Sequence, residues 1–199
     1  MADRTRIWID VGAHLGEKTF AEAERDRSLV VYAFEPNLSL VLRRAGRLPN
    51  WIVLPYAVGE KDGAAAFHFT KLTATSSLLP FHEPGREAWL GGEELQVERV
   101  QTVPVIRLDT FLEMAGIGEA EFLKIDAQGA DLSVVKSAGE RIRSFRKITL
   151  EVQITPVELY AGGSRKEDVV QYLEARGFTL DSVEVQSRGQ EENLTFLRR

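Results

Sequence analysis

The sequence predicts an α/β fold in which a mostly parallel, seven-stranded sheet with an antiparallel C-terminal strand carries helices on both faces. Short, almost wholly apolar runs alternate along the chain with amphipathic stretches, a pattern typical of strands buried on both faces of a parallel sheet. The last two apolar runs are joined by the short polar linker QSRGQEE, so we expect them to pair antiparallel. The 199 residues fit one domain, residues 1–199.

The first half of the chain predicts three core strands, at residues 7–11, 29–34 and 51–54. A turn at Gly12–Gly16 leads into a helix that ends near Arg25. A second helix follows Asn37, whose side chain is suited to cap it. The expected apolar face of this second helix has helical spacing and comprises Leu38, Val41, Leu42 and Ala45.

The middle of the chain is less regular. The run AAFHF is expected to add an antiparallel strand, and residues 103–106 a short edge strand, because Pro104 lacks a backbone donor. Residues 70–98 show no clear period, and so long a stretch in a compact domain is usually functional or mobile. We expect an insertion or lid there.

The second half of the chain predicts the remaining four strands, at residues 122–125, 148–152, 178–185 and 193–197. Between the expected strands at 148–152 and 178–185, Ser164 and Glu167 have the spacing of a capping box and predict the start of a helix. Gly177 is suited to end that helix.

Composition excludes several classes of protein. The net charge of −5 lacks the basic excess of nucleic-acid-binding proteins, and no apolar run is long enough to span a membrane. The N-terminal stretch MADRTRIWID lacks the apolar core of a signal peptide, and the absence of cysteine suits a reducing compartment. We therefore expect a cytoplasmic protein that binds neither nucleic acid nor membranes.

A glycine-rich turn marks the first candidate site. Asp10-Val11-Gly12-Ala13-His14-Leu15-Gly16 lies where a strand gives way to a helix, and ligands of open α/β sheets bind at the carboxyl ends of strands. Glycine allows the backbone to approach a ligand closely. The motif is G-x-x-x-G, not the G-x-G-x-x-G of dinucleotide sites, and Asp10 would repel a pyrophosphate. It would suit a cation, such as the amino group or sulfonium of S-adenosylmethionine.

Two further strand ends carry acidic residues. Glu35 follows the second strand, where an acid in nucleotide-binding domains hydrogen-bonds ribose hydroxyls, and Pro36 restricts the turn after it. Asp126 follows a later strand and should emerge at the same edge as Asp10. Gln128 lies in the turn after it, and we expect both to contact cofactor or acceptor.

The blocks DVGAHLG, YAFEP, AVGEKDG, LKIDAQGADL and LEV together resemble the FkbM-type methyltransferases, from Ile7 to about Phe178. The resemblance implies a Rossmann-like class I methyltransferase fold that uses S-adenosylmethionine and releases S-adenosylhomocysteine. It also implies O-methylation of a small-molecule acceptor, a hydroxyl of a sugar, polyketide or similar metabolite. The family commonly has Glu where this chain has Gln128 and Asp131, so a catalytic carboxylate at position 128 is absent here.

Position by position, the resemblance implies a set of cofactor contacts. Asp10, Gly12, Ala13 and Gly16 would line the methionine part, and Glu35 would hold the ribose. His14 and Pro36, next to these residues in the two turns, are expected to contact the cofactor as well. The adenine would lie near Tyr56, Ala57 and Val58. Asp126 would lie close to the donor methyl, and Asp126 and His14 are the candidate general bases.

Two alternatives stay open at this stage. A nicotinamide-dependent oxidoreductase shares the fold and the acid after the second strand, although it should show G-x-G-x-x-G. A catalytically silent domain of the same fold, used for interaction, is the other. No metal is expected, because His14, His68 and His82 lack the carboxylate spacing of a metal site.

Overall fold

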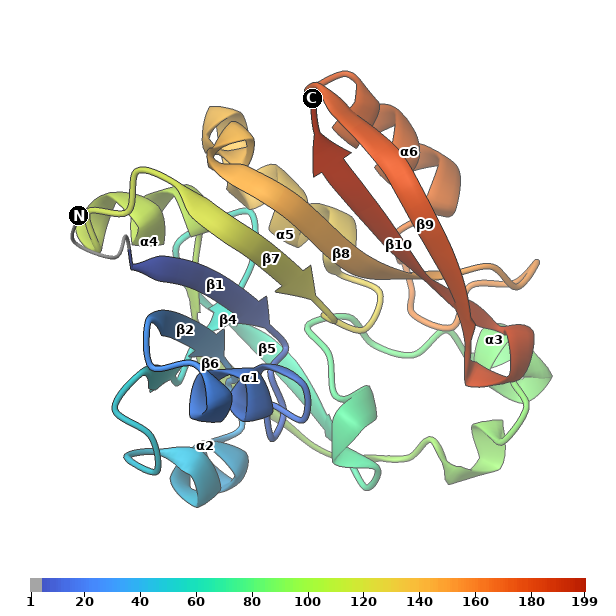
Figure 1. Ribbon diagram of the computed structural model, residues 1–199. Coiled ribbons are helices and arrows are strands. Elements are labelled where there is room, and N and C mark those ends of the chain that lie inside the picture. The colour runs from blue at the N-terminus through green and yellow to red at the C-terminus, as the bar shows by residue number, and fades with distance from the viewer. Residues whose placement is uncertain (1–4) are drawn as a thin grey trace.

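The computed structural model describes residues 5–199, so the first four residues, on which the signal-peptide expectation partly rests, lie outside it. A seven-stranded sheet forms the centre of the molecule, in the order β3-β2-β1-β7-β8-β10-β9 (Figure 1). All pairings are parallel except those of β10 with β8 and β9. The strands are β1 (Arg6–Val11), β2 (Leu29–Phe34), β3 (Trp51–Leu54), β7 (Ala120–Ile125), β8 (Phe145–Gln153), β9 (Phe178–Gln186) and β10 (Glu191–Arg198). The predicted sheet is confirmed, with each expected strand in it.

Helices cover both faces of this sheet, as predicted. On one face, buried residues of the strands pack with the helices α4 (Leu108–Met114), α5 (Asp131–Ser137) and α6 (Lys166–Glu174). On the other face, Ala23 of α1 (Thr19–Arg25) packs against β2 and Trp51. Strand β2 shows why the strands are apolar throughout: Phe34 belongs to the first cluster and Val31 to the second.

A smaller three-stranded sheet, in the order β4-β6-β5, lies beside the main one (Figure 1). It consists of β4 (Ala57–Val58), β5 (Gly63–Thr70) and β6 (Val97–Ile106). The antiparallel addition at AAFHF is confirmed as β5. The short edge strand at 103–106 was wrong, because β6 has ten residues and is the middle strand. Strand β4 pairs only with Val105 and Ile106 of β6. Pro104 comes directly before these two residues, so β4 does not extend along β6 as far as Pro104.

Residues 71–96 contain short helices: the 3-10 turns η1 (Thr73–Thr75) and η2 (Gly92–Glu94), and α3 (Glu83–Ala88). In Figure 1 this segment runs from the end of β5 past the carboxyl end of β7 to the turn of the β9–β10 hairpin. A hydrogen bond from the Leu90 amide to Gln190 Oε1, 2.7 Å long, joins the segment to that hairpin. The segment therefore borders the edge of the sheet where the candidate residues lie.

Two local expectations about helices had different outcomes. Asn37 caps α2 (Leu38–Arg44) as predicted, because its side chain accepts from the Ser39 amide. The expected apolar face was only partly right, since Leu38 and Leu42 are exposed and the buried pair is Leu40 and Val41.

The capping box at residues 164–167 was wrong. Helix α6 begins at Lys166 without a side-chain cap. The Ser164 hydroxyl instead accepts from the Leu132 amide at 2.8 Å, in the first turn of α5. It also donates to the Gly129 carbonyl at 2.9 Å. Ser164 therefore ties the chain before α6 to the turn after β7.

Within the described part of the chain, no helix is long and apolar enough to cross a membrane. The same residues contain no group of three or more His, Cys, Asp and Glu side chains placed to hold a metal ion.

Candidate active site

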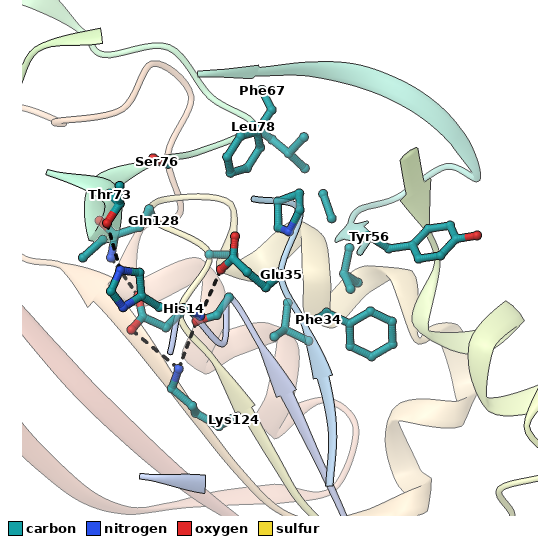
Figure 2. A pocket seen from close by; sticks show the side chains of 18 of the residues that line it. His14, Phe34, Glu35, Tyr56, Phe67, Thr73, Ser76, Leu78, Lys124 and Gln128 are labelled. Carbon is teal, nitrogen blue, oxygen red and sulfur yellow. Dashed lines mark hydrogen bonds and ion pairs between the residues drawn. The ribbon is translucent and has the colours of Figure 1, made fainter. Parts of the chain in front are cut away.

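A pocket of about 230 Å³ opens at the carboxyl ends of β1, β2 and β7 (Figure 2). These ends meet because the three strands are adjacent and parallel. Nine of the twelve residues expected to contact a cofactor line the pocket: Gly12, His14, Glu35, Pro36, Tyr56, Ala57, Val58, Asp126 and Gln128. The structure thus gathers residues from four separate parts of the sequence around one cavity.

The turn after β1 approaches the end of β7 very closely. A Cβ atom added to Gly12 would overlap the Asp126 carbonyl oxygen, and Gly12 has a φ of +69°. Only glycine fits here, because it has no Cβ and adopts positive φ freely. The glycine therefore allows the β1 and β7 turns to meet at the floor of the pocket.

His14 connects this turn to the segment that covers the pocket. Its backbone has a φ of 50°, which is uncommon for a residue with a side chain. The ring Nδ1 lies 2.8 Å from Glu17 Oε1, and Nε2 lies 2.9 Å from the Thr73 hydroxyl. Figure 2 shows this contact between His14 and Thr73, both of which line the pocket.

The other three expected residues lie behind the pocket wall. Ala13 is buried against the α1 side of the sheet. Gly16 faces the Trp51 ring so closely that a Cβ would overlap it. Asp10 is 1% exposed, and its Oδ2 accepts a hydrogen bond of 2.5 Å from the Thr19 hydroxyl.

Lys124 is the cation beside Asp10, and sequence reasoning missed it. Its Nζ lies 3.1 Å from Asp10 Oδ1 and 3.7 Å from Asp126 Oδ2, and it donates to the Gly12 carbonyl at 3.3 Å. Burial opposes the charge, but the carboxylates of Asp10 and Asp126 outweigh it and raise the pKa of Lys124. Asp10 therefore already has a cationic partner, which its position at a strand end did not indicate.

Glu35 has its carboxylate anchored by the backbone. Oε2 accepts from the His14 amide at 2.9 Å, and Oε1 accepts from the Asn37 amide at 2.8 Å. Burial raises the pKa of Glu35, and these two amides partly offset the effect. The carboxylate thus has a fixed position inside the pocket, as Figure 2 shows, with lone pairs left for a ligand.

A hydrogen-bonded network holds the turn after β7. Gln128 donates from Nε2 to Asp126 Oδ1 at 2.7 Å and to Glu151 Oε2 at 3.1 Å. The Tyr160 hydroxyl lies 2.8 Å from Gln128 Oε1 and 2.9 Å from the Thr75 carbonyl oxygen, and its single proton can be donated to either. The amide of Gln128 is therefore fixed on both sides, although its backbone has a φ of 51°.

Two further acids lie against this network, the buried Asp131 and the half-buried Glu151. Burial, reinforced by Asp126, raises the pKa of Asp131 to about 7. The same two causes raise the pKa of Glu151 to about 9. Strongly shifted carboxyl groups beside a cavity are typical of functional sites. Neither was singled out from the sequence as a site residue, because nothing local shows that the fold brings Asp126, Asp131 and Glu151 together.

Other wall residues come from outside the strand ends. Phe67 of β5 and Thr73, Ala74, Ser76 and Leu78 of the covering segment also line the pocket. Figure 2 shows Phe67 and Leu78 next to each other in its wall. The sequence placed the four residues of the segment only within the expected insertion or lid at residues 70–98. The Ser77 hydroxyl fixes this segment by donating to the Gln128 carbonyl at 2.7 Å.

The strand order, the reversed β10 and the pocket at the ends of β1, β2 and β7 together define a class I S-adenosylmethionine-dependent methyltransferase fold. Comparison with known proteins gives the family. The chain belongs to the methyltransferase FkbM domain family, whose model matches residues 10–180. Both the fold and the family predicted from the sequence are confirmed.

Individual relatives are distant. The chain is 24% identical over 155 residues to hexuronic acid methyltransferase AglP of Haloferax volcanii, covering 76% of this chain and 57% of that protein. It thus spans little more than half the length of this relative. Among solved structures it is similar to M. capricolum TrmK in complex with S-adenosyl-homocysteine, with a TM-score of 0.53, 7% identity, and coverage of 98% and 62%. It is also similar to the antibiotic-resistance methyltransferase Kmr, with a TM-score of 0.50, 14% identity, and coverage of 100% and 89%.

Proposed function

We propose that the chain is an S-adenosylmethionine-dependent O-methyltransferase that acts on a hydroxyl of a small metabolite, such as a sugar or polyketide, in the cytoplasm. The observation that carries the proposal is the anchored Glu35 carboxylate, in a pocket that also contains the Gly12 turn and Asp126. Membership of the FkbM domain family supports the same cofactor.

The residues present fit an adenosyl cofactor. Glu35 is buried, yet each oxygen keeps accepting capacity beyond its backbone amide, which suits a pair of ribose hydroxyls. Beside it, the side chains of Val58, Phe67 and Leu78 form an apolar wall suited to adenine. The polar turn residues lie at the other end of the pocket, where the methionine part would bind.

The cofactor supplies a methyl group on a sulfonium, and alignment contributes much of the acceleration of its displacement. In this chain Gln128 fixes Asp126 through the 2.7 Å hydrogen bond, and Lys124 lies on the other side of that carboxylate. Asp126 is thus held to receive the proton of an acceptor hydroxyl. His14 is the second candidate base, although both its ring nitrogens already have partners.

Glu35→Ala tests the cofactor site. Loss of hydrogen bonds to a charged group costs roughly 1.5–3 kcal/mol, so we expect S-adenosylmethionine to bind about 10- to 150-fold more weakly. Calorimetry measures the affinity, with the exposed Glu98→Ala as a matched control that should bind like the original chain. Equal affinity in the two variants would remove Glu35 from the site.

A thermal-shift comparison separates the alternatives. S-adenosylhomocysteine should raise the melting temperature and NADH should not, because the turn lacks the glycine spacing of a dinucleotide site. Stabilisation by NADH alone would favour an oxidoreductase. Cofactor binding without turnover on any hydroxyl acceptor would favour a catalytically silent domain.

A further inference from the structure

A second cavity, of about 300 Å³, adjoins the pocket. It lies between the segment 71–96, which also lines the first pocket, and the turn of the β9–β10 hairpin, η4 (Ser187–Gly189). Gln128 lines both cavities, and Thr75 of the second cavity lies between Ala74 and Ser76 of the first. Both cavities therefore border the turn after β7 at Gln128, two residues from Asp126.

The first pocket alone is too small for two reactants. Its volume of about 230 Å³ lies below the ~300–1,000 Å³ usual for a single small-molecule site. A methyl acceptor must touch the donor methyl, so its binding space has to adjoin the cofactor pocket. The second cavity meets this requirement through Gln128.

Residues with a strained backbone line both of these cavities. Four non-glycine residues of the described chain have positive φ: His14, Gln128, Ser187 and Arg188, with values from 47° to 58°. His14 and Gln128 line the first pocket, and Ser187 and Arg188 line the second. Such strain persists where the surrounding structure enforces it, and it clusters at functional sites.

The lining of the second cavity is that of a site for a polyhydroxylated ligand. Half-buried Trp89 offers an aromatic face, and the carboxyl groups of Glu93, Glu94 and Glu191 can accept from hydroxyls. Arg188 supplies the one guanidinium among the lining residues. Even with Glu191 protonated, two carboxylates face that single cation.

We infer that this cavity binds the methyl acceptor, and that the acceptor is an electrically neutral, polyhydroxylated molecule such as a sugar, with acidic sugars disfavoured. The inference rests on the proposed methyltransferase function. Aromatic residues stack on the apolar face of a ring, and the surplus of carboxylates repels an anionic ligand. The cavity thus selects against the carboxylate of a hexuronic acid.

A matched pair of ligands tests the inference: methyl glucoside and the methyl glycoside of glucuronic acid, which differ only at C6, a hydroxymethyl group in the first and a carboxylate in the second. Binding is measured by saturation-transfer NMR on the protein saturated with S-adenosylhomocysteine. We expect the glucoside to bind and the glucuronide to bind at least tenfold more weakly. If S-adenosylhomocysteine itself fails to bind, the proposed function is wrong. If it binds but neither sugar does, or the glucuronide binds better, only the present inference is overturned.

Two variants connect the binding to this cavity. Trp89→Ala should weaken the glucoside about tenfold, since stacked aromatic contacts contribute ~0.5–1.5 kcal/mol beyond area burial. The affinity for S-adenosylhomocysteine should stay within twofold. Met114→Ala, at an exposed position on α4, is the matched control.

Glu94→Lys serves where Trp89→Ala fails to fold, because Glu94 is exposed and its carboxylate makes no ion pair within residues 5–199. In this variant the ratio of the glucoside affinity to the glucuronide affinity should be smaller than in the original chain. Unchanged sugar affinities in both folded variants would place the sugar elsewhere and overturn the assignment.

Discussion

At the scale of single residues, the site depends on how charges are paired behind the pocket wall. Lys124 lies among Asp10, Asp126 and the Gly12 carbonyl, and Gln128 donates to two carboxyl groups at once. An amide suits position 128 in this chain, since a glutamate there would add another carboxylate beside Asp126 and Glu151. Glutamine at position 128 is therefore compatible with an intact site.

Lys124→Met should destabilise the fold by about 3–5 kcal/mol, because it leaves the buried Asp10 carboxylate without its cation. Urea unfolding measures the change. The double variant Lys124→Met, Asp10→Asn removes both charges and should recover a large part of the loss. A single variant as stable as the original chain would show that the ion pair contributes nothing.

Glu151→Gln should change how stability depends on pH. The folded chain holds the Glu151 proton up to about pH 9, whereas the usual pKa is 4.5, so its contribution is greatest at low pH and is lost as the pH rises toward 9. Glutamine does not titrate. The variant should therefore gain in unfolding free energy relative to the original chain between pH 5 and pH 9, and a difference independent of pH would contradict the shifted pKa.

At the scale of elements, the contact between the turns after β1 and β7 is the feature on which the pocket depends. Gly12→Ala would force a Cβ against the Asp126 carbonyl, in addition to the strain of positive φ. Gly46→Ala is a matched control, because Gly46 has a φ of +72° with nothing within 4 Å of the added Cβ.

The control should cost about 1–2 kcal/mol, the usual penalty of a left-handed backbone. Gly12→Ala should cost several kcal/mol more and weaken S-adenosylmethionine binding as well. Urea unfolding and calorimetry measure the two effects. Equal losses of stability in the two variants would mean that the β1 and β7 turns are not in close contact.

Elements with a strong local signal could be predicted from the sequence, and those that depend on neighbours could not. Apolar runs predicted all seven strands of the main sheet, and Asn37 predicted the start of α2. Ser164 had the right spacing for a cap, yet its hydroxyl bonds to α5, a partner that only the tertiary fold brings near. Pro104 indicated an edge strand, but β4 is too short to reach it.

At the scale of the whole molecule, the site is assembled from the edge of the main sheet, the small sheet and the segment 71–96. The sequence predicted the first contribution, because acids and glycines directly follow apolar runs. It could not place Phe67, Thr73 or Leu78, since these reach the pocket through long-range packing. The same limit applies to Lys124, which inside a strand resembles any partly exposed lysine.

A structure of the chain bound to S-adenosylhomocysteine would show where the cofactor binds. We expect the adenosyl group in the pocket at the ends of β1, β2 and β7, with ribose hydroxyls hydrogen-bonded to the Glu35 carboxylate. An adenosyl group bound outside this pocket, or a Glu35 carboxylate that contacts only the His14 and Asn37 amides, would contradict this expectation.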